Sequence, residues 1–178
     1  MAWTTPGTAT AGDVLTASFW NLNVRDNTNE LYGSMRRLAY QTRTSFYSVS
    51  STTVAGASDI FSSDLTWTAD GTSAYQIEFF AVQGYSPDVL DTYISLRLVN
   101  GAGTDLGTMA LVGPSQVTGR RGYAPIHCKI FYTPAAGSAS INARAIAISS
   151  GAGGIEAGAG GANTNLPMWM AVYGPNLT

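Results

Sequence analysis

An alternation of apolar and polar residues with a period of two runs through most of this chain from about residue 38 onward. Such alternation puts apolar side chains on one face of a β-strand and polar side chains on the other. About eight segments carry the pattern, separated by clusters of Gly, Pro, Asn, Asp and Ser; they are 46–49, 60–67, 75–79, 93–99, 108–112, 126–132, 141–148 and 168–173. Many short strands with such turns predict an antiparallel β-sandwich or barrel.

The connections between these segments argue against a parallel sheet. They are too short to hold the repeated crossover helices that parallel strands require. Asn100-Gly101 directly follows the 93–99 segment and is typical of a hairpin turn. A mainly β, antiparallel body is therefore predicted over residues 38–178.

Residues 1–37 have a different pattern and predict an arm followed by one short α-helix. Residues 1–11 are rich in Thr, Ala, Gly and Pro, which is typical of an extended arm. Thr16 is a candidate N-cap. An apolar stripe with 4-3-4 spacing follows, formed by Trp20, Val24, Asn27 and Leu31. Because Asn is a poor helix former, this helix must pack against the body of its own chain or against symmetry-related copies.

The composition limits the classes of protein that this chain can belong to. Hydrophobic residues make up 45% of it and charged residues only 11%, with a net charge of −2. This hydrophobic content excludes a disordered chain, the glycines lack the three-residue period of collagen, and the charge argues against a nucleic-acid partner. Monomers generally need surface charge to stay apart, so we expect burial in an assembly of copies. A Ser-, Thr- and Asn-rich β surface is the alternative.

The sequence predicts neither a targeting or membrane-spanning segment nor a reactive cysteine. Met1 to Pro6 lack the basic and apolar regions of a signal peptide. No apolar run approaches the ~18 residues of a membrane span, so we expect a protein made in a cytoplasm, with no membrane partner. Cys128 is the only cysteine, which excludes an intrachain disulfide. Its neighbour His127 would point to the opposite strand face, so Cys128 is interpreted as a small, inert, buried residue.

No constellation of catalytic or metal-binding residues is visible. His127 is the only histidine, and no Gly-x-Ser-x-Gly sequence supplies a nucleophile elbow. Zinc would need more His and Cys ligands, and no segment has the ligand spacing of a calcium loop. The aspartates lie in predicted turns, where their side chains bond the backbone; they are Asp59, Asp64, Asp70, Asp88 and Asp91. We expect no catalytic site, metal or cofactor.

Several features remain candidates for binding. The glycine-rich segment 149–164 is interpreted as a flexible rim loop, with contact to a partner left open. Arg36-Arg37 are either solvated or docked on an acidic lattice or neighbouring subunit, whereas Arg120-Arg121 are read as solvated. Candidate platforms for a glycan are Tyr85, Tyr123 and Trp67, although aromatic residues in β-sandwiches more often belong to the core.

A specific pattern occupies the first 32 residues. Its residues are Trp3-Thr4, Pro6, Thr10-Ala11-Gly12-Asp13-Val14-Leu15-Thr16-Ala17, Asn21, Arg25-Asp26-Asn27 and Leu31. This order resembles the opening of small virion proteins of tailed bacteriophages, of the head-decoration, head-fibre and minor-tail type. The family more often has an apolar residue where this chain has Thr28. The resemblance implies an attachment or oligomer helix that includes Trp20, Val24, Arg25, Asp26, Asn27 and Leu31.

The body is similar to trimeric jelly-roll domains of viral and complement type. The similar segments are Leu65-Thr66-Trp67-Thr68-Ala69-Asp70-Gly71, then 75–79, and finally Met170-Ala171-Val172-Tyr173-Gly174-Pro175. The resemblance implies a jelly-roll-like sandwich and a homotrimeric structural protein on the surface of a phage particle. Its arm would dock on the major capsid protein or on tail proteins.

Three functions follow from these patterns. The first is a capsid decoration or head-spike protein, which the scarcity of charge favours because it fits a stabilising, stacking role. The second is a minor tail or fibre component whose body binds a host-surface glycan. The third is a trimeric lectin-like binding module.

Overall fold

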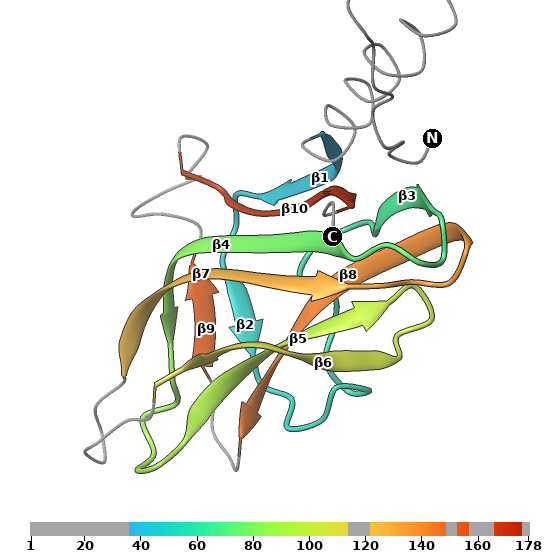
Figure 1. The fold of residues 1–178 in the computed structure, drawn as a ribbon. Coiled ribbons are helices and arrows are strands. Elements are labelled where there is room, and N and C mark those ends of the chain that lie inside the picture. The colour runs from blue at the N-terminus through green and yellow to red at the C-terminus, as the bar shows by residue number, and fades with distance from the viewer. Residues whose placement is uncertain (1–35, 114–121, 149–152, 157–165, 176–178) are drawn as a thin grey trace, which may run out of the picture.

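Ten β-strands in two antiparallel sheets make up the part of the chain that this computed structural model describes, residues 36–113, 122–148, 153–156 and 166–175 (Figure 1). The strands are β1 (Arg37–Arg43), β2 (Tyr47–Val49), β3 (Leu65–Ala69), β4 (Tyr75–Tyr85), β5 (Tyr93–Asn100), β6 (Asp105–Val112), β7 (Tyr123–Tyr132), β8 (Gly137–Ile148), β9 (Gly153–Glu156) and β10 (Met168–Pro175). The predicted antiparallel β-sandwich is confirmed at this level. The arm and helix predicted over 1–37 lie almost entirely outside the described residues.

The first sheet has six strands and is organised around β4. Its order is β1-β10-β4-β9-β2, with β7 paired to the other edge of β4. Strand β10 accompanies the first part of β4, where Ile77 pairs with Val172, and β9 accompanies the last part, where Tyr85 pairs with Gly154. A register shift in the β4–β7 pairing falls between these two parts, and Figure 1 shows β4 bending there. Irregularities of this kind bend a strand and re-aim its side chains.

The second sheet has four strands in the order β3-β8-β5-β6. The predicted turn at Asn100-Gly101 is confirmed, because it joins β5 to β6. The side-chain oxygen of Asn100 accepts hydrogen bonds from the backbone N–H groups of Ala102 and Thr104, at 3.1 and 2.9 Å. Gly103 has a φ of 78° in this turn, a conformation that favours glycine.

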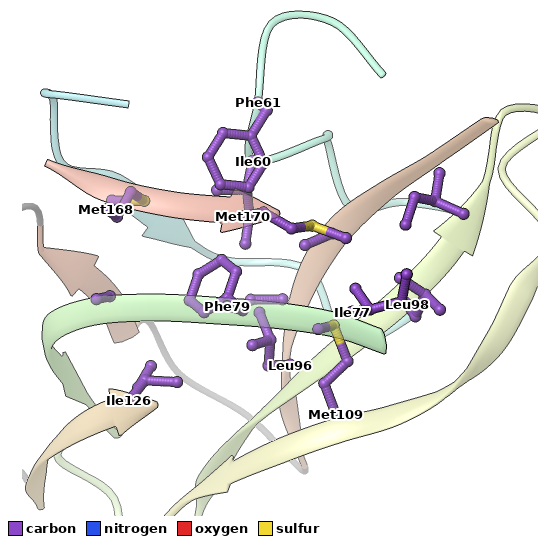
Figure 2. Packing of buried hydrophobic residues seen from close by; sticks show 14 of the residues in the cluster. Ile60, Phe61, Ile77, Phe79, Leu96, Leu98, Met109, Ile126, Met168 and Met170 are labelled. Carbon is purple, nitrogen blue, oxygen red and sulfur yellow. The ribbon is translucent and has the colours of Figure 1, made fainter. Parts of the chain in front are cut away.

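The core lies between the two sheets and follows the alternation seen in the sequence. Strand β4 buries every second residue from Tyr75 to Ala81, and β10 contributes Met168 and Met170. Figure 2 shows side chains from β4, β5, β6 and β10 meeting in this layer. Burying this apolar surface stabilises the fold by roughly 25 cal/mol for each Å² removed from water.

The strand predicted over 60–67 is only partly present, since β3 begins at Leu65. Ile60 and Phe61 are buried in the core, as the apolar pattern implies. The side chain of Asn142 on β8 accepts a hydrogen bond from Phe61 N–H and donates to Phe61 C=O, at 3.2 and 3.1 Å. The side chain of Asn142 therefore makes the hydrogen bonds to Phe61 that the backbone of a neighbouring strand would otherwise make.

The glycine-rich segment is not simply the predicted rim loop. Its residues Gly153–Glu156 form β9, a strand between β4 and β2 within the six-stranded sheet. A Cβ on Gly153 would lie 2.6 Å from both Ile94 Cδ1 and the carbonyl oxygen of Tyr85. The glycine lets this strand approach the core closely, which a reading based on chain flexibility misses.

Candidate functional site

Exposed aromatic side chains gather on the six-stranded sheet. Among the described residues, the large exposed aromatic side chains belong to this sheet or directly precede one of its strands; they are Tyr40, Phe46, Tyr123 and Phe131. Exposed apolar side chains that cluster on one face mark a surface for a partner, whereas single ones need no explanation. Two groups of rings form on this sheet, one at each part of β4.

The first group is the three-ring cluster, which consists of Phe46, Tyr85 and Tyr123. The rings of Phe46 and Tyr85 are nearly parallel, with centroids 5.9 Å apart and an angle of 10° between their planes. The ring of Tyr123 lies 5.7 Å from that of Tyr85 and is tilted by 50°. Phe46 is 44% exposed and Tyr123 is 59% exposed, so these two rings are open to solvent, whereas Tyr85 is half-buried.

Strand register brings these three rings together. Tyr85 at the end of β4 pairs with Tyr123 at the start of β7 on one side and with Gly154 of β9 on the other. Gly154 in turn pairs with Ser48 of β2, two residues after Phe46. Directly paired residues share a face of a sheet, and diagonal neighbours lie within reach of aromatic side chains. Phe46 thus reaches Tyr85 across Gly154.

Gly154 leaves the room that the Phe46 ring occupies. A Cβ at this position would collide with ring atoms of Phe46 and would lie 2.7 Å from Cζ of Tyr85. Contacts of that length are essentially absent between real Cβ atoms and their neighbours, so a larger residue would displace a ring. The glycine is therefore part of the cluster, although it carries no functional group.

Two sets of hydrogen bonds hold the ends of the cluster. The guanidinium of Arg43 donates to the carbonyl oxygens of Ser45, Phe46 and Ile60, at 3.1, 2.9 and 2.7 Å. This fixes the backbone that presents the Phe46 ring. On the other side, Ser86 exchanges bonds with Gly122: Ser86 N–H donates to Gly122 C=O, and Gly122 N–H donates to Ser86 Oγ, both at 2.8 Å. These bonds tie the end of β4 to the start of β7.

Polar side chains flank the three-ring cluster on the same face of the sheet. Gln83 lies two residues before Tyr85 on β4, so it shares the outward face with Tyr85. It pairs directly with Glu156 of β9, which lies two residues after Gly154. An amide and a carboxylate therefore border the rings, and both are half-buried.

The second group is the aromatic row, formed by Tyr40, Trp169, Phe80 and His127 on β1, β10, β4 and β7. Neighbouring ring centroids lie 6.2, 5.8 and 6.0 Å apart in that order. The pair of Trp169 and Phe80 is stacked, with 21° between the ring planes. The row crosses four adjacent strands of the outward face, and the guanidinium of Arg37 lies 4.2 Å from the centroid of the Tyr40 ring.

Glu78 is an acidic residue beside the aromatic row. Its carboxylate lies 2.7 Å from Nε2 of His127 and 4.0 Å from Nζ of Lys129, and its side chain is only 13% exposed. Burial raises the pKa of the Tyr173 hydroxyl above its ordinary value, and the negative charge of Glu78 makes the second-largest contribution to this rise. The face thus carries both signs of charge among its rings.

The structure brings together the predicted glycan platform residues Tyr85 and Tyr123. The third candidate, Trp67, is not a platform: it is buried in the core, with its ring 5.5 Å from that of Tyr75. Of the predicted docking pair, Arg37 contacts the Tyr40 ring and Arg36 is exposed. The remaining candidates lie outside the described residues; they are Trp20, Val24, Arg25, Asp26, Asn27, Leu31, Arg120 and Arg121.

Sequence reasoning missed Phe46 and the aromatic row as functional candidates. Phe46 looked like the start of a strand, but it precedes β2 and carries its ring on the outward face. Trp169 and Phe80 stand in outward positions of strands whose other positions are apolar as well. An aromatic residue at a position where the alternation calls for a polar one is the signal that could have found them.

Asp59 and Asp64 bond side chains of β8 and not, as predicted, the backbone of their own turns, and Cys128 is half-buried and not fully buried. Asp59 accepts a hydrogen bond from Nε of Arg144, and Asp64 accepts one from Ser140 Oγ, both at 2.6 Å. Burial raises the pKa of the Cys128 thiol to about 11. In the described ranges no three His, Cys, Asp or Glu side chains lie close enough together to hold a metal ion. Those ranges also contain no helix of the length and hydropathy that a membrane crossing requires.

No family model matches the sequence, and no curated protein does. Solved structures with a similar arrangement include the Eiger TNF of S. frugiperda, with 14% identity, a TM-score of 0.43 and coverage of 80% of this chain and 95% of that one. The protein in T=1 particles derived from infectious bursal virus has 15% identity and a TM-score of 0.36, and the match covers 82% of this chain and 37% of that one. A carbohydrate-binding module of Cellvibrio mixtus lichenase 5A, in complex with cellotriose, has 12% identity and a TM-score of 0.29, and the match covers 79% of this chain and 100% of that one.

This chain therefore spans well under half the length of the bursal virus protein that it resembles. With TM-scores below 0.5, the three likenesses assign neither a family nor a function to it.

Proposed function

We propose that this chain is a non-enzymatic structural protein of a bacteriophage virion. In this proposal it is a capsid decoration or head-spike protein on the particle surface, assembled as a homotrimer and docked on the major capsid protein through residues 1–37. The phage-like pattern of residues 3–31 supports the virion setting, and the low charged fraction of 11% supports extensive burial in an assembly.

The aromatic row is the observation that carries the self-association. A row of rings across β1, β10, β4 and β7 gives an isolated chain an apolar face that water solvates poorly. Aromatic residues are enriched at the cores of protein interfaces, where they supply large contact area. Phe131, which is 55% exposed on β7, extends the apolar surface beyond the row.

A second copy of this chain is the occupant that the charges favour. The face holds Arg37 near one edge, the carboxylate of Glu78 in the middle and Lys129 on β7. Glu78 balances His127 and Lys129 within one chain, so repulsion between like charges does little to oppose the contact of this face with further copies. The edge strand of this face, β1, directly follows residues 1–36 in the sequence.

The role on the particle would be stabilisation by mass action. A protein that binds the assembled shell and not its free subunits shifts the equilibrium toward the shell, by about 2.7 kcal/mol per site at a hundredfold excess over the dissociation constant. Interfaces of ordinary size, about 1,200–2,000 Å² in total, suffice for such binding without a covalent bond or a metal.

The experiment compares the mass of the purified full-length chain with that of surface variants, by light scattering after size exclusion. We expect a trimer for the unaltered chain and dissociation for the double variant Tyr40→Ser with Phe131→Ser. Leu111→Ser is the matched control, because Leu111 is 60% exposed but lies on β6 of the other sheet. A monomeric unaltered chain, both free and on particles, contradicts the proposal.

A second candidate function is a minor tail or fibre component that binds a host-surface glycan. The three-ring cluster is the specific observation that favours it. Particles stripped of the protein distinguish the two candidates. A decoration protein leaves stripped particles fragile on heating but able to adsorb to cells, whereas an adhesion protein leaves them robust and unable to adsorb.

A further inference from the structure

We propose that the three-ring cluster of Phe46, Tyr85 and Tyr123 binds a neutral oligosaccharide made of pyranose rings. The inference rests on the second candidate function, glycan binding by this cluster, and names the class of sugar; it does not depend on whether the chain forms a trimer. It rests on four properties of the cluster: exposed ring faces, bordering polar groups, the charge of those groups, and a framework that holds the rings before any ligand arrives.

The first property is the set of open ring faces. The C–H groups on one face of a pyranose carry a small positive charge and pack against the negative face of an aromatic ring. Phe46 and Tyr85 are nearly parallel but offset, and Tyr123 is tilted by 50° to Tyr85. Two differently inclined platforms suit consecutive sugar rings, because successive residues of an oligosaccharide are rotated relative to one another.

The second property is the polar border. Gln83 and Glu156 form a cross-strand pair on the same face, in the row next to Tyr85. Ser48, which pairs with Gly154, is an exposed hydroxyl on the other side. An amide offers two donors and an acceptor, and a carboxylate accepts from two neighbouring hydroxyls. Rings below and hydrogen-bonding groups at the edge match a ligand with apolar faces and a hydroxyl rim.

The third property is the charge, which favours a neutral ligand over an acidic one. Glu156 puts a carboxylate beside the rings and repels acidic sugars and phosphates. Arg43 is the cation nearest Phe46 in sequence, but its guanidinium donates to the carbonyl oxygens of Ser45, Phe46 and Ile60. This guanidinium therefore supports the platform and does not offer itself to an anion.

The fourth property is preorganisation. Gly154 leaves space for the Phe46 ring, Arg43 fixes the backbone of Phe46, and the paired bonds between Ser86 and Gly122 fix the β4–β7 end. Ordering a side chain on binding costs conformational entropy, and a cluster ordered by folding avoids that cost. Phe46 and Tyr123 remain exposed although neighbouring bonds hold the cluster, as a binding platform requires.

The test is a titration of the full-length chain with soluble hexasaccharides, followed by calorimetry and by NMR of the tyrosine rings. The neutral probes are cellohexaose, maltohexaose and mannohexaose, and the acidic comparator is oligosialic acid. We expect at least one neutral probe to bind. We expect Phe46→Ala and Tyr123→Ala each to weaken that binding by about tenfold or more, as loss of a central aromatic contact does.

Phe131→Ala is the matched control, because Phe131 is an equally exposed ring on the same strand as Tyr123 but outside the cluster. It should bind the sugar like the unaltered chain. Oligomeric mass is measured on the same samples: Phe131→Ala should reduce self-association without affecting the sugar, and Tyr123→Ala should do the reverse. Because soluble probes report the affinity of each single site, the two proposals can fail separately.

Three results overturn the inference. The first is that none of the neutral probes binds. The second is tighter binding of the acidic comparator than of the neutral probes. The third is an equal loss of binding in Phe131→Ala and in Tyr123→Ala, with the circular dichroism of both variants unchanged.

Discussion

Gly154 lies against the ring of Phe46, so that a single methyl group on the glycine would collide with the ring. The same methyl group would lie 2.7 Å from Cζ of Tyr85. Two residues separated by more than a hundred positions are thus mutually dependent: the ring needs the glycine in order to reach Tyr85. This relationship joins a strand of the glycine-rich segment to the candidate binding surface.

Replacing Gly154 by alanine should therefore displace the Phe46 ring and loosen the three-ring cluster. We expect the free energy of unfolding in urea to fall by about 1–3 kcal/mol, as overpacking of a close contact does. The near-ultraviolet circular dichroism of the tyrosines should change as well. Gly113→Ala is the control, since a Cβ there meets no atom within 4 Å. Equal stability of the two variants would contradict this account of Gly154.

Replacing Asn142 by alanine should be one of the most damaging single changes in the described part of the chain. Asn142 is 1% exposed, and its amide bonds both the N–H and the C=O of Phe61 and also donates to Asp64 at 3.1 Å. Loss of this side chain leaves buried backbone groups without partners, each at a cost of about 1–3 kcal/mol. We expect unfolding by urea at a clearly lower concentration.

Gln41→Ala is the control variant for Asn142→Ala. Gln41 donates one exposed hydrogen bond to Ser63 Oγ at 2.7 Å. Solvent replaces an exposed bond of this kind, so its loss should cost below about 1 kcal/mol. A larger effect in Gln41→Ala than in Asn142→Ala would show that segment 60–64 is held in some other way.

Asp70 should stabilise the fold near neutral pH, and this contribution should be lost in acid. Hydrogen bonds from the Ser73 hydroxyl, the Ser73 N–H and the Thr72 N–H lower the pKa of Asp70 from 3.8 to about 2. Because the folded-state pKa lies below the unfolded-state value, the ionised carboxylate stabilises the fold above about pH 4. This contribution is lost as the pH falls toward 2. Since Asp70 is exposed, solvent screening keeps it below about 1 kcal/mol.

Asp70→Asn tests this pH dependence. The variant should melt at a lower temperature than the unaltered chain near neutral pH, and the difference should shrink as the pH is lowered through the folded-state pKa. Asp88→Asn, at another exposed position, serves as the control. A difference in melting temperature that is constant with pH would assign the effect of Asp70→Asn to altered packing of the turn.

Cys128 should react slowly with alkylating reagents in the folded protein. Burial raises the pKa of its thiol from 9.0 to about 11, with a smaller contribution from the charge of Glu78. Because the thiolate is the reactive species, at pH 8 a rise of this size lowers the reactive fraction about a hundredfold. The rate of reaction with iodoacetamide should rise to that of a free thiol in concentrated guanidinium chloride. Equal rates in the two states would show that Cys128 is accessible and ionised.

Much of the sandwich was predictable from the alternation of side chains. Segments such as 75–79 and 168–173 were placed on strands, and the inward positions Ile77, Phe79 and Met170 are buried as their spacing requires. This succeeds because a strand presents successive side chains to opposite faces, so two-residue periodicity is a local property of the sequence. The hairpin at Asn100-Gly101 was predictable for the same reason, since its turn residues are adjacent in the chain.

Other features had no such local signal. The residues of β9 include two glycines and show no alternation, so that this strand is recognisable only through its pairing with β2 and β4. The three-ring cluster draws on positions 46, 85 and 123 and on the glycine at 154, which no spacing rule connects. Tyr85 and Trp67 looked equivalent as candidate platforms, yet one faces outward and the other lies in the core.

The division between these two kinds of feature has a physical cause. Which residues form strands, and which of their faces turns inward, depends on neighbours two positions apart, and the free energy of burying apolar side chains enforces it. Which strands become neighbours depends on packing over the whole domain. That packing sets β7, β4, β9 and β2 side by side and thereby assembles Phe46, Tyr85 and Tyr123 into one exposed surface.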